Sequence, residues 1–137
     1  MNEIPFYTAA NLSRDPELRN TNDGKSVVRL SLAVTPRRRE QGTWVDGTTS
    51  FLDATVWGSQ AENVALSLHK GDRVIVTGRL ETRTYTATKG ANAGQEVRKL
   101  EIVVDEIGPS LRWAEAQIQR TSGQRAEEGT ASEEAPF

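Results

Sequence analysis

Hydrophobic and polar residues alternate with a period of two along several segments of the chain, which predicts β-strands. The clearest case is 26–36, where Val28, Leu30, Leu32 and Val34 share one face. Such alternation leaves one apolar face for a core and one polar face for solvent or a ligand. Further strands are expected at 3–12, 50–57, 72–86 and 95–107.

Between the third and fourth expected strands the apolar period changes to that of a helix. Apolar residues recur at helical spacing through 59–69, with Ser59 as the expected N-cap and Gly71 near the C-terminal end. The order is therefore three strands, one helix and two strands. That order predicts an all-β, five-stranded OB-fold, a partly open Greek-key barrel whose single helix lies between strands three and four.

The connecting segments are polar and rich in turn residues. We expect a loop at 13–17, a turn at 20–24 and a flexible turn at 89–94. The segment 37–49 is polar and hairpin-like. No internal repeat is evident.

Apolar content collapses after Trp113, and we expect 114–137 to be mostly disordered. Residues 1–113 hold 15 lysines and arginines against 14 acidic residues, whereas 114–137 hold 2 against 5. The chain is thus expected to divide into a barrel at 1–112 and a flexible acidic tail at 113–137.

An aromatic ring after a proline and beside carboxylates fits a partner's apolar pocket with a basic rim. The predicted partner-binding tip is Glu133, Glu134, Ala135, Pro136 and Phe137.

Composition argues against several classes of protein. The chain of 137 residues has no cysteine and a single histidine, His69, which excludes disulfides, thiolate zinc sites and two-histidine metal sites. We expect no cofactor, no metal and no enzymatic activity. No apolar run is long enough to span a membrane, and the N-terminus lacks the pattern of a secretory signal, so a cytoplasmic, nucleoid-associated protein is expected.

The outer faces of two expected strands carry aromatic rings and arginines instead of small polar residues. Unpaired bases stack on flat rings, and phosphates pair with cations, so this combination suits single-stranded nucleic acid without base preference. The predicted nucleic-acid-binding residues are Phe51, Trp57, Tyr85, Arg29, Arg37, Arg38, Arg39, Arg79, Arg83 and Trp44.

Each of these residues also has an ordinary structural interpretation. Phe51 and Trp57 are core residues if the faces of their strand are reversed, and the arginines fit a solvated surface. Trp44 also suits a subunit contact, and His69 suits a helix end. At the level of function, the alternatives are an OB-fold adaptor that acts mainly through protein contacts, such as a primosome-type subunit, and a small hydrolase that depends on His69.

Five segments in family order resemble bacterial single-stranded DNA-binding protein, most closely its actinobacterial branch. They are 11–19, 32–37, 56–65, 70–80 and 104–112. The resemblance implies a homotetramer of OB-folds that wraps single-stranded DNA in replication, recombination and repair. It also implies docking of replication and repair proteins on the acidic tip.

The resemblance assigns stacking roles to Phe51, Trp57 and Tyr85, which stand where the family carries aromatic residues. It also implies that 108–116 continues as a hooked strand that clamps paired subunits. The chain departs from the family in two places. Arg38 and Arg39 stand where the family often has an aromatic residue, and the tip carries glutamates where aspartates are usual.

Overall fold

The computed structural model describes residues 2–91 and 93–121, and its elements follow the predicted order with three short strands added. The elements of this part of the chain are β1 (Ile4–Leu12), β2 (Glu17–Asn20), β3 (Ser26–Val34), β4 (Arg37–Glu40), β5 (Thr43–Asp46), β6 (Ser50–Trp57), α1 (Ser59–Ser67), β7 (Arg73–Thr86) and β8 (Glu96–Pro109).

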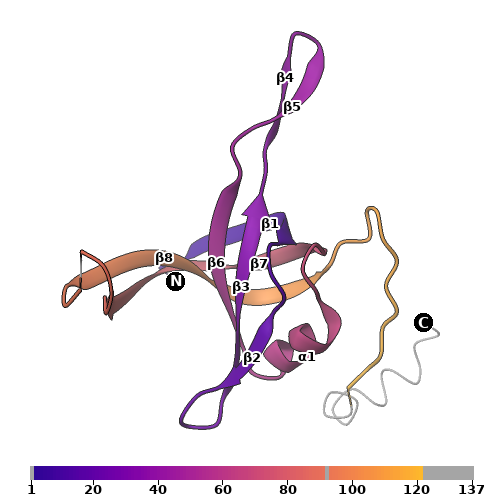
Figure 1. The fold of residues 1–137 in the computed structure, drawn as a ribbon. Helices are drawn as coiled ribbons and strands as arrows, with labels where there is room; N and C mark the ends of the chain where they lie inside the picture. The colour runs from indigo at the N-terminus through magenta and orange to yellow at the C-terminus, as the bar shows by residue number, and fades with distance from the viewer. Residues whose placement is uncertain (1, 92, 122–137) are drawn as a thin grey trace.

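Five of the strands close a barrel. The sheet runs β1–β7–β8–β6–β3, and β3 returns to β1 through the pairs Asn11–Ala33 and Leu12–Leu32 (Figure 1). All neighbours are antiparallel except β6 and β8, which run parallel. A closed five-stranded sheet with one helix between β6 and β7 is the OB-fold that the sequence predicts, and the prediction is confirmed.

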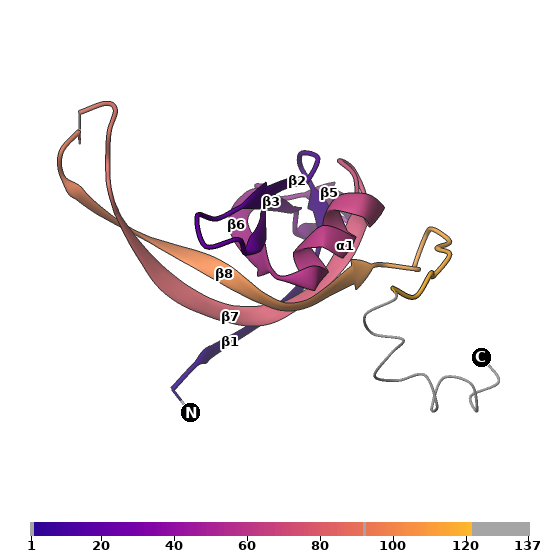
Figure 2. The ribbon, with the colours of Figure 1, turned by 90° about the horizontal axis from the view of Figure 1, so that it is seen from below.

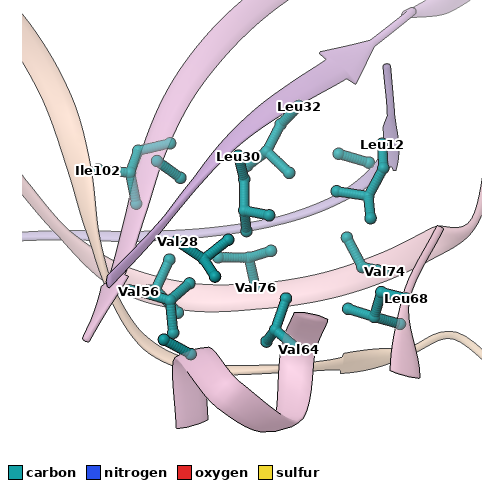
Figure 3. Packing of buried hydrophobic residues seen from close by; sticks show 14 residues of the cluster. Leu12, Val28, Leu30, Leu32, Val56, Val64, Leu68, Val74, Val76 and Ile102 are labelled. Atoms are coloured by element: carbon teal, nitrogen blue, oxygen red, sulfur yellow. The ribbon is translucent and has the colours of Figure 1, made fainter. Parts of the chain in front are cut away.

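The inward-facing residues of every barrel strand form one core. From β3, Val28, Leu30 and Leu32 are essentially inaccessible to solvent. The buried face of α1, which includes Val64, packs under one end of the barrel (Figure 3). Burying a branched aliphatic side chain contributes roughly 1.5–3 kcal/mol, so this cluster fixes which strand faces point outward.

Two local predictions were wrong. The segment between the predicted loop and turn forms β2, which pairs with β3 from Glu17–Arg29 to Asn20–Ser26. The N-cap of α1 is Gly58 and not Ser59, and no side chain caps this end. The hooked strand at 108–116 stays a prediction: β8 ends at Pro109 and 110–121 form no helix or strand within the described chain, but the predicted strand pairs with a second subunit.

Two projections leave the barrel. One is the β4–β5 hairpin, where Gln41 and Gly42 both have positive φ angles, of 50° and 81°. These angles fit the two-residue turn that matches the twist of paired strands. The other is the arm, which we define as the outer halves of β7 and β8, about Glu81–Thr86 and Glu96–Glu101, with the loop that joins them. Figure 2 shows the arm curving far from the barrel body.

Candidate nucleic-acid interface

The outer face of β6 carries two of the three predicted stacking rings. Phe51 and Trp57 are 67% and 47% exposed, because the residues between them that face inward hold the strand in the core. Thr55, which strict alternation along β6 places on the same face, is buried. Its strand is flanked at that point on both sides, by Arg29 of β3 and Val103 of β8.

The third ring lies on the arm. Tyr85 is 42% exposed, and the guanidinium carbon of Arg83 is 5.8 Å from its ring centroid. Arg83 is directly opposite Lys99 on β8, and side chains directly opposite in an antiparallel pair share one face. The arm therefore presents a ring and two cations on one surface.

One ion pair joins the arm to the barrel face, and a second ion pair lies within the arm itself. The ammonium group of Lys99 donates a hydrogen bond to the carboxylate of Asp53, between Phe51 and Trp57 on β6. This hydrogen bond raises the pKa of Lys99 above its ordinary value. Arg83 lies 3.6 Å from a carboxylate oxygen of Glu101, whose side chain is mostly covered. The three rings thus belong to one continuous surface.

Lys99 was missed by the sequence reasoning. Its place beside Arg83 depends on the register of the arm, which the tertiary structure fixes at the turn. The amide of Ala87 donates to the carbonyl of Gln95 at 3.0 Å, which fixes the strands that follow. Counting from that bond places Lys99 opposite Arg83, one of the predicted residues.

Arg79 shares the outer side of β7 with Arg83, but its charge is already neutralised. Its Nε donates to Glu81 at 2.5 Å and lies 3.8 Å from Glu3. The hydrogen bond to Glu81 is the main reason that the pKa of Arg79 is raised. A phosphate must displace these carboxylates to reach it.

The β4–β5 hairpin separates the three consecutive arginines between its two faces. Arg37 and Arg39 lie on the face of Trp44, with Arg39 directly opposite the ring residue and Arg37 6.0 Å from the ring centroid. Arg38 lies on the other face and pairs with Glu40 at 3.0 Å. Arg37 also pairs with Asp46 at 3.4 Å, so among the described residues Arg39 is the cation on the face of Trp44 that has no ion pair.

The predicted residues not yet discussed are Arg29, which the structure describes, and the five residues of the partner-binding tip, which it does not describe. Arg29 is exposed on β3 and has no ion pair within the part of the chain that the structure describes. The predicted tip at 133–137 lies outside the described residues.

Across 2–91 and 93–121, no group of three metal-ligating side chains occurs, and no helix has the length and apolar character of a membrane span.

This surface offers flat rings for stacking and cations for phosphates, with carboxylates beside most of the cations. A stretch of 6–110 matches the family model described as the single-strand binding protein family. The chain belongs to that family. The resemblance noted in five sequence segments is therefore confirmed.

Relatives in actinobacteria agree with this membership. A single-stranded DNA-binding protein of Paenarthrobacter aurescens is 50% identical over 121 residues, covering 87% of this chain and 68% of the relative. One of Mycobacterium leprae is 47% identical over 114 residues, covering 82% and 66%. The crystal structure of a small single-stranded DNA-binding protein from Streptomyces coelicolor matches with a TM-score of 0.66 and 35% identity, covering 81% of this chain and 97% of that one.

Proposed function

We propose that this chain binds single-stranded DNA with little base preference and protects it during replication, recombination and repair. One observation carries the proposal. Phe51, Trp57 and Tyr85 are all open to solvent on a surface that the Lys99–Asp53 pair makes continuous. Stacking contributes roughly 1–3 kcal/mol per base and accepts any base, so several rings in one track give affinity without sequence preference.

The experiment that tests this function is a titration of tryptophan fluorescence with poly-dT at two salt concentrations. We expect saturable quenching, and we expect the affinity to fall with salt because phosphate contacts release counterions. Quenching that is absent at low salt, from a folded protein, would overturn the proposal.

We further propose that the chain assembles as a homotetramer, as the family resemblance implies. The main chain of β1 pairs with β7 on one side, whereas pairing with β3 involves only Asn11 and Leu12. The rest of β1 leaves an edge, and two exposed apolar residues lie close by on the β1–β7 surface, Tyr7 and Ile75. An open strand edge beside apolar side chains favours pairing with a second chain. Light scattering measures the mass of the assembly directly.

The acidic tip at 133–137 is proposed to recruit replication and repair proteins, within a cytoplasmic, nucleoid-associated protein that has no enzymatic role. The alternative function, an adaptor that acts mainly through protein contacts, predicts a higher affinity for a partner protein than for single-stranded DNA. If a partner protein binds far more tightly than poly-dT at one salt concentration, the adaptor function is favoured. The ring-bearing surface favours DNA as the principal ligand.

A further inference from the structure

A second aromatic and cationic group lies outside the surface described above. Trp113 follows the end of β8 and is 73% exposed. The guanidinium carbons of Arg73 and Arg112 lie 4.8 and 5.1 Å from its ring centroid. We call Trp113, Arg73 and Arg112 the Trp113 cluster.

The charges of this cluster are not neutralised by any carboxylate in the part of the chain that the structure describes. Within 2–91 and 93–121, neither Arg73 nor Arg112 has a carboxylate within 4.0 Å, in contrast to Arg37 and Arg83. The Nε of Arg73 is buried and has no hydrogen-bond partner in the described chain. Two guanidinium groups beside one open ring therefore keep their full attraction for an anion.

The cluster is held in place by the barrel. The amide of Ser110 donates to the carbonyl of Arg73 at 2.8 Å, which fixes the chain just before Trp113. The hydroxyl of Ser110 also accepts a hydrogen bond from the amide of Arg112 at 3.3 Å. The ring and its two cations are thus attached to the start of β7 and the end of β8.

The cluster and the arm lie at opposite ends of β8. Tyr85 is opposite Val97, and 12 residues separate Val97 from Pro109 at the other end of the strand. At 3.3 Å per residue this path is roughly 40 Å along a curved strand. Figure 2 shows β8 running from the arm, past the barrel, to the segment that carries Trp113. The β6 part of the surface lies nearer to the cluster, because Thr55 is opposite Val103, which is six residues or roughly 20 Å from Pro109. A strand must therefore be longer than the few nucleotides that occupy the three rings to reach the cluster as well.

We propose that the Trp113 cluster is a second contact site for single-stranded DNA. It receives a base and its phosphates from a strand that already covers the main surface, by which we mean the surface that carries Phe51, Trp57 and Tyr85. The proposal rests on the proposed function of that surface. It repeats the chemistry of the Arg83–Tyr85 and Arg37–Trp44 groups, in which an exposed ring stands beside a guanidinium. A polyanion compensates both charges, whereas burying two unpaired arginines in a subunit contact is costly.

The first test compares oligonucleotides of two lengths, about 5 and about 40 thymidines, on wild type and Trp113→Ala. We expect the affinity for the long strand to fall about 5- to 100-fold, and the affinity for the short strand to stay within about twofold. Trp113→Phe should restore most of the affinity because it restores a stacking ring. Equal affinities of wild type and Trp113→Ala for the long strand would overturn the proposal.

The second test uses Trp113 as its own reporter. The chain has three tryptophans, so Trp44→Phe combined with Trp57→Phe leaves Trp113 as the only one. We expect the long strand to quench its fluorescence in a salt-dependent manner and the short strand to leave it unchanged. If Trp113→Ala lowers the mass of the assembly and the reporter is silent, the residue is a subunit contact and the proposal is wrong.

The two tests also separate this proposal from the function of the main surface. If the short strand binds and Trp113 does not respond to the long one, only the second site is refuted. If neither strand binds to folded wild type, the proposed function itself fails.

Discussion

Lys99 and Asp53 are 46 residues apart in the chain, and a hydrogen bond between their side chains joins β8 to β6 on the open surface of the barrel. The pair has opposite effects on DNA binding. It holds the arm beside Phe51 and Trp57, and it supplies a carboxylate that competes with phosphate for the ammonium group. Exposed ion pairs contribute only about 0–1 kcal/mol, so DNA can displace this one at low cost.

Asp53→Asn should therefore strengthen binding. Removing the competing carboxylate frees Lys99 for a phosphate, and we expect affinity at low salt to rise up to about fivefold. The plot of log affinity against log salt should steepen by about 0.7 for one additional phosphate contact. Filter binding or fluorescence over a salt series measures both quantities.

The matched control is Glu17→Gln, which removes a carboxylate that pairs with Arg19 at 3.2 Å on β2. It should leave affinity and slope unchanged. In Asp53→Asn the pKa of Lys99 should also fall toward its ordinary 10.5, which NMR titration detects. Weaker binding by folded Asp53→Asn would show that the pair serves to position Lys99.

Loss of a stacking ring should weaken binding directly. Trp57→Ala or Tyr85→Ala removes one flat partner for a base, and each should cost about 1–3 kcal/mol of binding free energy. Trp57→Phe keeps a ring and should retain most of the affinity. Thermal unfolding of each variant checks the fold, and unchanged affinity in a folded alanine variant would refute the site assignment.

The two faces of the β4–β5 hairpin should differ in their contribution to the affinity for single-stranded DNA. Arg39→Ala removes a cation beside Trp44 that has no ion pair in the described chain, and it should cost about 1 kcal/mol and reduce the salt slope by about 0.7. Arg38→Ala is the control, because Arg38 faces the other side and pairs with Glu40. Equal losses in both variants would contradict the facial division.

Gly78 should be needed for barrel closure. A Cβ added there would lie 2.2 Å from the carbonyl oxygen of Val103, at the irregularity where β7 and β8 change register. Backbone atoms yield little, so Gly78→Ala should lower the free energy of unfolding by roughly 2–4 kcal/mol. Gly108→Ala on the same strand pair meets no atom within 4 Å and should cost much less in a urea titration.

Deleting 135–137 should separate partner recruitment from DNA binding. The deletion removes Pro136 and the ring of Phe137 but no predicted DNA-binding residue. We expect poly-dT affinity within about twofold of wild type and reduced capture of replication and repair proteins. Equal capture by the truncated and the full chain would refute the proposed role of the tip.

Much of the fold was accessible from local pattern. The period-two alternation of 26–34 and 50–57 identified β3 and β6 and their buried faces, because a strand's two faces are set by its own sequence. The same alternation placed Phe51 and Trp57 outside. The short strand β2 was missed, because its four residues are all exposed and carry no apolar face.

The sequence alone determined the elements, the core and the presence of rings and arginines on outward faces, since these depend on residue type and local period. Only the tertiary structure decided which cations are free. Arg79 is neutralised by Glu81 and Glu3, and Lys99 meets Asp53 from a distant strand. Arg73, at the start of β7, meets Trp113 just beyond the end of β8. Those pairings depend on strand register and barrel closure, which bring together residues far apart in the chain.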